Sequence, residues 1–503
     1  MTESTTPLEH APRTGGCFDG DDPWWAIAAT QPRMAQGTHT GNQEGRPTTK
    51  AEDRLDRMLQ VPHAKDEPPV LAPRELHTEH AGDSEGFLPR EPNSLRDAGI
   101  TANEIEALLL KYLLNRGSAT GRDLSMQLKL PFRLIEGLLR QMKADLLVGY
   151  KASAPVGDYE YHLTDAGCER GRRYSEQSTY FGAAPVSLRD YTASVEQQAI
   201  GKLPLRMPDL ERAFSDLLIN PALLSQLGQA LTSGRGMFLY GAPGNGKSSI
   251  AERVTNAYGK PIWIPRAISV MGQIIRLYDP SNHEELPLAP SEELVDPRPL
   301  DHRWVRIRRP TIVAGGELTL NNLELILNES TGISEAPLQM KSNCGTLVID
   351  DFGRQRISPK ELLNRWIVPL ERRHDYLNLA SGRKIEVPFE QLIIFSTNLQ
   401  PKELVDEAFL RRIPYKIDVI DPTEDEFRDL FRRVAHSMGI EPQEDAINYL
   451  IDRHYKSAGR AYRFCHARDL LLQVKHCCTF HERPFEMTSE GFDVAVKNYF
   501  ALL

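Results

Sequence analysis

Long apolar runs and paired cysteines are what this sequence lacks most plainly. No stretch of about 18 apolar residues occurs, so we expect neither a transmembrane helix nor insertion into a membrane. The first residues contain no basic segment followed by an apolar one, so no secretory signal is predicted. The 6 cysteines form no C-x-x-C pair, and their spacing indicates neither a zinc site nor a disulfide framework. Reduced thiols in a cytoplasm are the simplest interpretation.

The chain also has fewer basic than acidic residues, 60 Lys and Arg against 69 Asp and Glu. The chain has a net charge of −9 and an isoelectric point near 5.9, which argues against a globally basic nucleic-acid-binding protein. A local basic surface remains compatible with these values. The 503 residues are more than one domain usually holds, and the hydrophobic content of 40% is enough for a packed core.

The first part of the chain has too few apolar clusters to fold. Residues 1–96 are rich in Pro, Gly, Thr, His and acidic groups, and such a segment cannot bury enough surface to offset its ordering entropy. We therefore predict that 1–96 is disordered. Asp22-Pro-Trp-Trp25 is an apolar island within it, either a docking peptide or an island without consequence.

A small α+β domain is predicted over 97–175. Thr101 and Glu104 form a capping box before an apolar-periodic helix, a second short helix follows, and Pro131 is placed at the first position of a third. Two strand-like runs then flank a turn-rich segment at 154–158. Three helices followed by a β-hairpin resemble a winged helix of the helix-turn-helix type. Residues 176–204 read as a connector.

The third helix of this domain does not decide what the domain binds. It presents Arg133, Arg140 and Lys143 outward, but also Glu136 and Asp145, whereas a DNA-reading helix normally has a denser basic footprint. The domain therefore either binds DNA, binds protein or only packs.

The clearest signal in the chain is a phosphate-binding loop. An apolar strand at 237–240 leads into a segment that fits G-x-x-x-x-G-K-[ST], and a helical run follows. In this context the loop N–H groups and the helix N-terminus bind phosphate, Lys247 reaches the β- and γ-phosphates, and Ser248 holds Mg²⁺. The expected ATP-binding residues of the loop are Gly241, Ala242, Pro243, Gly244, Asn245, Gly246, Lys247, Ser248 and Ser249.

Two further strands are predicted to bring polar groups to this loop. The apolar run at 345–349 ends in Asp350, expected to hold Mg²⁺, and Asp351, expected to orient or deprotonate the attacking water. A second apolar run ends in Asn398, which can hydrogen-bond that water or the γ-phosphate. The alternative for each is a polar residue that only ends a strand or caps a turn.

Together these segments resemble the AAA+ ATPases, with Walker A at 241–248, Walker B at 347–351 and sensor 1 at Asn398. The resemblance implies an α/β P-loop core over 205–420, an α-helical lid over 421–503 and assembly into a homo-oligomeric ring of six subunits. Phe-Leu-Arg-Arg-Ile-Pro at 409–414 resembles the arginine-finger region, with Arg412 as first choice and Arg411 as second. Arg468 resembles a sensor 2 arginine; Arg460 and Arg463 are rivals.

More narrowly, the order of these motifs is similar to the MoxR-type and enhancer-binding activator clade. That clade carries a hairpin before sensor 1, and 376–388 reads as a hairpin turning at Ser381-Gly382. The chain departs from the clade in having Asp351 where Glu is usual, so hydrolysis is expected to be slow or the water to sit closer. The activators' Gly-Ala-Phe-Thr-Gly-Ala loop is absent.

A long insert is predicted between the Walker motifs, at about 260–344. Within it, Arg306 and Arg308 alternate with Val305 and Ile307, as on a strand. The two arginines are read either as a basic strip that contacts a substrate or as a solvated strand face.

The function predicted from the sequence is ATP binding and Mg²⁺-dependent hydrolysis by a ring-forming AAA+ ATPase that remodels a macromolecular partner, with an unidentified protein client as the expected partner. The alternatives are a DNA-binding regulator or loader that uses the winged helix, and a scaffold that binds ATP but barely hydrolyses it.

Overall fold

The computed structural model of the chain describes residues 86–155, 157–288 and 299–500. These residues all belong to one compact structural unit, Gly82–Leu503. The predicted disorder of 1–85 and the island Asp22-Pro-Trp-Trp25 lie outside the described residues. Residues 86–96 do not fit the prediction of disorder. The Glu91 N–H donates to Pro299 O at 2.7 Å, and the Asp301 N–H donates to Pro89 O at 3.0 Å. The predicted boundary at 96 is too late, because these backbone hydrogen bonds leave no trace in composition.

The helices and the hairpin predicted over 97–175 are present. In chain order the elements are α2 (Ala102–Arg116), β1 (Ser118–Thr120), α3 (Gly121–Leu128), α4 (Phe132–Ala144), β2 (Val148–Ala154), β3 (Asp158–Leu163) and α5 (Asp165–Gln177). The capping box at Thr101 and Glu104 forms as predicted, whereas Pro131 is the N-cap of α4 and not its first residue. The strands make an antiparallel sheet in the order β1-β3-β2. Assignment of this domain as a winged helix stays a prediction.

The segment predicted as a connector, 176–204, contains secondary structure. It holds β4 (Val186–Ser187), α6 (Leu188–Gln198) and the short η1 (Ile200–Lys202). Tyr191 and Val195 on α6 are buried in a core shared with later strands. These apolar residues lie four apart on one helix face, but their polar neighbours hide the pattern in the sequence. The connector prediction is therefore corrected over this helix.

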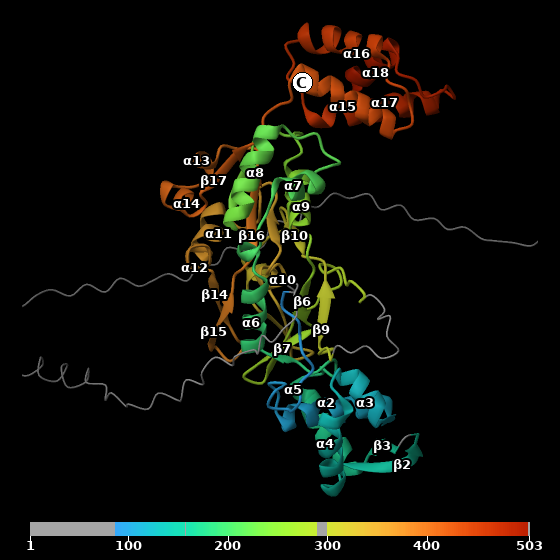
Figure 1. Ribbon diagram of the computed structural model, residues 1–503, viewed down its shortest axis with the longest axis vertical. Helices are drawn as coiled ribbons and strands as arrows, with labels where there is room; N and C mark the ends of the chain where they lie inside the picture. The colour runs from blue at the N-terminus through green and yellow to red at the C-terminus, as the bar shows by residue number, and fades with distance from the viewer. Residues whose placement is uncertain (1–85, 156, 289–298, 501–503) are drawn as a thin grey trace, which may run out of the picture. The chain divides into compact units, whose positions relative to one another are not determined.

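A five-stranded parallel sheet forms the centre of the nucleotide-binding part, in the order β10-β13-β16-β5-β17. Its strands are β5 (Met237–Tyr240), β10 (Thr311–Ala314), β13 (Thr346–Ile349), β16 (Leu392–Thr397) and β17 (Tyr415–Asp418). Successive side chains of a strand point to opposite faces, so Met237 and Leu239 join one core and Phe238 joins the other. Both faces are covered by helices, which makes this part an α/β fold as predicted (Figure 1).

The covering helices separate by face. The core that contains Leu239 is completed by α7 (Met207–Ala213), α8 (Pro221–Ser233), α9 (Lys247–Val254) and η2 (Thr255–Tyr258). The core that contains Phe238 is completed by α11 (Pro359–Arg365), α12 (Ile367–Arg372), α13 (Pro401–Leu404) and α14 (Glu407–Arg412). A sheet buried on both faces explains why its strands read as continuous apolar runs.

The predicted insert at 260–344 is not a single block. Its strand β10 belongs to the central sheet, where it pairs in parallel with β13. A second sheet has the order β11-β12-β8-β7-β4, and β6 pairs with β9 as a separate ribbon. The elements of this region are β6 (Ile262–Pro265), β7 (Ala267–Val270), β8 (Gln273–Arg276), β9 (Trp304–Ile307), η3 (Leu320–Leu323), β11 (Ile326–Asn328), β12 (Ile333–Glu335) and α10 (Leu338–Lys341).

The hairpin predicted before sensor 1 is confirmed. It consists of β14 (His374–Asn378) and β15 (Lys384–Pro388), paired antiparallel. Gly382 has a φ of +76°, the left-handed conformation that such a turn requires and that glycine adopts without strain.

The end of the chain is helical, as predicted. It comprises α15 (Glu424–Ser437), α16 (Glu444–Leu450), the π-helical η4 (Ile451–Lys456), α17 (Phe464–Phe480) and α18 (Ser489–Tyr499), which close around their own apolar core. The role of this part as a lid stays a prediction. Across the described parts of the chain, the helices are too short or too polar to span a bilayer.

Protonation of His466 is expected to destabilise these C-terminal helices. His466 is buried, and its Nδ1 lies 3.0 Å from the Tyr455 hydroxyl. Burial lowers the pKa of His466 from 6.5 to about 4. An unfolded histidine titrates near 6.5, so this stabilisation is present above about pH 6.5 and is lost as the pH falls towards 4. Urea unfolding followed by circular dichroism should show a larger loss between these pH values in the wild type than in His466→Gln. Parallel losses would contradict this.

Candidate nucleotide site

The loop between β5 and α9 has a backbone shaped for an anion. Gly241, Gly244 and Gly246 have φ angles of +137°, +84° and +79°, which a residue with a side chain adopts only under strain. Helix α9 begins directly after them, at Lys247. A glycine loop of this kind turns N–H groups inward, and the helix N-terminus adds the positive end of its dipole.

Lys247 lies inside this loop. Its Nζ donates to Gly241 O at 3.1 Å, to Ala242 O at 3.0 Å and to Asn398 Oδ1 at 2.6 Å. Burial lowers the pKa of Lys247, while the carboxylates of Asp351 and Asp350 act in the opposite direction. Nearby carboxylates thus favour the charged ammonium that phosphate binding uses.

Ser248 and Asp350 are brought together as predicted for a magnesium site. The Ser248 hydroxyl donates to the Asp350 carboxylate, at 2.8 Å from Oδ2 and 3.0 Å from Oδ1. Within the described ranges there is no group of three His, Cys, Asp or Glu that could hold a metal. One hydroxyl and one carboxylate nevertheless fit Mg²⁺, because this ion commonly keeps several waters and takes its other ligands from substrate phosphates.

Asp351 and Asn398 also face each other. The Asn398 Nδ2 donates to Asp351 Oδ1 at 3.4 Å, and the Asn398 Oδ1 accepts from Lys247. Asp351 has a φ of +49°, unusual for a residue other than glycine but tolerated by Asp. Asn398 therefore connects the lysine of the loop to the carboxylate proposed to handle water.

Gln355 is a residue of this site that sequence reasoning missed. Its Nε2 donates to Asp350 O at 2.6 Å and to Asp351 O at 3.2 Å, and its Oε1 accepts from the Gly353 N–H at 2.8 Å. Gln355 thus fixes the turn that carries both carboxylates. No local motif signals this role.

A second contact missed from the sequence joins the loop to the C-terminal helices. The Asn245 Nδ2 donates to Asp421 Oδ1 at 2.7 Å and to Val419 O at 3.1 Å. Asp421 also forms an ion pair with Arg463, at the start of α17. Arg463 also lies beside the loop itself, because a Cβ placed on Gly244 would lie 3.7 Å from Arg463 Cβ.

Gly244 lies against the start of α17. The Cys465 N–H donates to Gly244 O at 2.9 Å. A Cβ placed on Gly244 would lie 2.5 Å from Cys465 Sγ, closer than real carbon and sulfur atoms approach. Glycine is needed here both for its φ and for this contact.

The other arginines proposed as sensor 2 do not reach the loop. Arg468 has 72% of its side chain exposed, and its partner is Asp469 at 3.7 Å. Arg460 donates to His454 O at 2.7 Å and lies over the Phe500 ring. Arg463, named from the sequence only as a rival, is the one beside the nucleotide site.

The two arginine-finger candidates lie at the end of α14. The Arg412 Nε donates to Glu371 Oε1 at 2.6 Å, and its Nη1 donates to Ala408 O at 3.0 Å. Asp406 caps α14 by accepting from the Phe409 N–H. Among the described residues, Arg411 and Arg412 do not contact the loop of their own chain, and their role as arginine fingers stays a prediction.

A comparison with known protein families finds a match in the C-terminal helices. Residues 423–498 match the family model described as a domain of unknown function, DUF8689. No curated protein matches the sequence of the chain.

Three solved structures illustrate the likeness in three dimensions. The RuvB Holliday junction branch migration motor of Thermotoga maritima is 14% identical, with a TM-score of 0.34 over 58% of this chain and 73% of that one. NtrX from Brucella abortus in complex with ATP is 14% identical, with a TM-score of 0.35 over 58% of each chain. Domain III of the Thermotoga maritima replication initiation protein DnaA is 15% identical, with a TM-score of 0.33 over 59% of this chain and 98% of that one. Likeness at this level assigns no activity to this chain.

A methyl group at Gly244 is expected to weaken ATP binding through the contact with Cys465. Gly246→Ala is the matched control, because Gly246 also has a positive φ but its added Cβ would meet no atom within 4 Å. Overpacking costs about 1–3 kcal/mol, so Gly244→Ala should bind ATP about tenfold more weakly than Gly246→Ala. Cys465→Ala should recover this difference in the Gly244→Ala background. Titration with a fluorescent ATP analogue measures all four proteins, and equal losses in both glycine variants would contradict the contact.

Proposed function

We propose that the chain is an ATPase of the AAA+ type that binds ATP with Mg²⁺ and hydrolyses it. The observation that carries the proposal is the convergence of Lys247, Ser248, Asp350 and Asn398 at one edge of a parallel sheet, with Lys247 Nζ 2.6 Å from Asn398 Oδ1 and Ser248 Oγ 2.8 Å from Asp350 Oδ2. These are the residue types and positions that phosphoryl transfer uses for phosphate binding, metal binding and water positioning.

Each residue has a distinct role in the proposed reaction. Lys247 Nζ would exchange its bonds to Gly241 O and Ala242 O for phosphate oxygens, and would stabilise the charge that builds up on them. Mg²⁺ held by Ser248 and Asp350 would neutralise part of the same charge. Asp351 would accept a proton from water as the water oxygen bonds to the γ-phosphorus and the bond to the β–γ bridging oxygen breaks. Asn398 would hold Asp351 and Lys247 in position for this step.

We further propose that six copies form a ring that remodels a protein client. The support is the resemblance of the motifs to AAA+ proteins, which includes an arginine-finger region at 409–414. A ring would place Arg412 of one subunit at the γ-phosphate of the next. The finer resemblance to MoxR-type ATPases rests on the hairpin β14–β15 and stays part of this proposal.

A DNA-binding role is the second candidate, and the side chains of α4 count against it. Arg133 pairs with Glu91 at 2.7 Å, Arg140 pairs with Glu136 at 2.5 Å, and Lys143 lies over the Tyr150 ring. Phosphate contacts would require these cations to leave their partners, which lowers their net contribution to DNA affinity. Binding of the full chain to a DNA duplex at two salt concentrations distinguishes the candidates, since phosphate contacts weaken steeply with salt.

Substitution of Lys247 and Asp350 should separate ATP binding from turnover. Lys247→Ala should lose nucleotide binding. Asp350→Ala should retain part of the binding but lose Mg²⁺-dependent turnover by about 10²-fold or more, because it removes charge stabilisation in the transition state. Lys260→Ala, an exposed lysine outside the loop, serves as control. Unchanged ATP affinity in Lys247→Ala would refute the site. If the wild type binds ATP without hydrolysing it, the result would favour the alternative of an ATP-binding scaffold, which the presence of Asp351 in place of the usual Glu suggests.

Arg412→Ala should keep ATP binding and lose turnover by about 10³–10⁵-fold, since an arginine supplied by a neighbour stabilises charge that appears only in the transition state. Lys247→Ala subunits retain Arg412 and should restore some activity in mixed rings. Glu371→Ala is the control, because it breaks the ion pair between Arg412 and Glu371 but keeps the arginine. It should leave turnover near the wild-type rate. If Arg412→Ala and Arg411→Ala both hydrolyse ATP normally, the shared site is wrong.

A further inference from the structure

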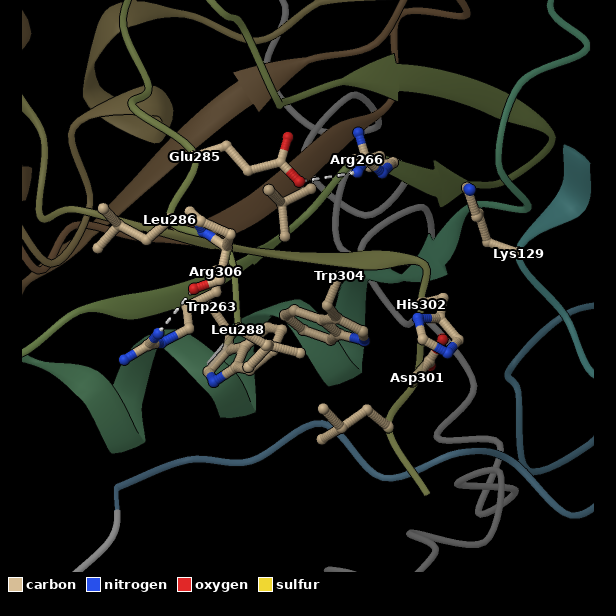
Figure 2. Close-up of a pocket in the computed structure, with 13 residues that line it drawn as sticks. Lys129, Trp263, Arg266, Glu285, Leu286, Leu288, Asp301, His302, Trp304 and Arg306 are labelled. Carbon is tan, nitrogen blue, oxygen red and sulfur yellow. Dashed lines mark hydrogen bonds and ion pairs between the residues drawn. The ribbon is translucent and has the colours of Figure 1, made fainter. Parts of the chain in front are cut away.

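A pocket of about 150 Å³ lies beside the β6–β9 ribbon, apart from the nucleotide site. Its apolar wall is made by Trp263, Leu288 and Trp304 (Figure 2). Trp304 is buried, and the Phe87 ring packs against it at a centroid distance of 5.1 Å. Leu288 is 37% exposed. A volume of this size suits a single side chain and falls below that of ordinary small-molecule sites.

Two basic side chains, Arg306 and Lys129, lie beside this apolar wall. Arg306 donates from Nη1 to Pro287 O at 3.4 Å, and Lys129 is exposed at the end of α3. Within 86–155, 157–288 and 299–500, neither of them has a carboxylate within ion-pair distance. Figure 2 shows Trp304 and Leu288 between Arg306 on one side and Lys129 on the other.

Arg266 is only partly satisfied as well. Its Nη2 lies 3.4 Å from Glu285 Oε1, a long ion pair, and its guanidinium lies over the Tyr278 ring. Its Nε is buried and has no hydrogen-bond partner in the described part of the chain. The buried Nε is out of reach of a partner, but the Arg266 side chain as a whole is 30% exposed, so an added carboxylate can approach the rest of its guanidinium.

The acidic residues of the pocket do not offset these cations. Asp301 is occupied by Arg303, whose Nε and Nη2 donate to its carboxylate at 3.0 and 2.7 Å, and both side chains are buried. Glu285 is the remaining carboxylate of the lining. Among the described residues, the lining therefore combines an apolar wall with more positive than negative charge.

We propose that this pocket binds a short acidic segment of a partner protein. One apolar or aromatic side chain of the segment would fill the space beside Trp263 and Leu288, and an adjacent carboxylate would bind Arg306 and Arg266. Buried aromatic and arginine groups are the usual anchors of such contacts. Single-stranded nucleic acid fits less well. Phe87 packs against Trp304 and so covers a ring that a base would stack on, and the neighbouring Arg308 is paired with Glu284 at 3.1 Å. The described residues of the pocket thus form no continuous row of free cations for a phosphate backbone.

This site is independent of the proposed ATP chemistry, because its lining shares no residue with the phosphate loop. Lys247→Ala should therefore bind the segment like the wild type, so a failure of the ATPase proposal would leave this one testable.

Peptide display on the full-length protein tests the proposal. A random peptide library is selected on the wild type and counter-selected on Arg306→Glu. The selected peptides should combine Asp or Glu with an apolar residue. Fluorescence anisotropy should then show affinity lost by about tenfold or more in Arg306→Glu and in Leu288→Asp, because each removes one of the two kinds of contact. Arg308→Glu is the matched control, since it reverses a charge two residues from Arg306 but lies outside the lining, and it should bind normally.

Three results would overturn the proposal. The first is that no selected peptide depends on Arg306, and the second is that Arg308→Glu weakens binding as much as Arg306→Glu. The third is that a dT12 oligonucleotide binds the wild type and loses affinity in Arg306→Glu, which would make the pocket a nucleic-acid site. Unchanged thermal melting of each variant establishes that lost binding does not reflect lost folding.

Discussion

The nucleotide site depends on β16 lying between β5 and β13. The three strands are parallel, with Thr397 paired to Tyr240 and Phe395 paired to Ile349. Parallel strands end at the same edge of a sheet, so the residues that follow them meet there although they are far apart in sequence. The bond from Lys247 to Asn398 spans 151 residues, and the bond from Ser248 to Asp350 spans 102. A register slip of one residue in β16 would exchange the side chains that face its two buried cores and would move Asn398 away from both partners.

The sequence was sufficient for features whose signal is local. The glycine loop, the acidic strand end, the capping box at Thr101 and the hairpin at Gly382 each follow from residues close together in the chain. Contacts between distant segments could not be read in this way. The hydrogen bond from Asn245 to Asp421 spans 176 residues, and Asp421 in turn forms an ion pair with Arg463. The arginine beside the loop is therefore Arg463, whereas the local sequence pattern favoured Arg468. Helix α6 and strand β10 were missed for a related reason, because partners elsewhere in the fold determine their burial.

Net charge proves a poor guide to where this chain can bind. The cations of α4 that the sequence singled out are matched by Glu91, Glu136 or an aromatic ring. Lys129 and Arg306, two cations without a carboxylate partner among the described residues, come from segments far apart in sequence and line the same small pocket. Charge that is left unneutralised, and not charge that is abundant, marks the surface where an anionic partner gains most.

The contact of Gly244 with Cys465 also has a mechanical meaning. The same loop that would bind phosphates carries the hydrogen bond that docks α17. If ATP changes the strength of this docking by some factor, thermodynamic linkage requires that docking change ATP affinity by the same factor. A force that pulls the C-terminal helices away from the loop would then shift the equilibrium between bound and free ATP. In that case a force applied to the helices after Asp421 would change the affinity of the loop for ATP.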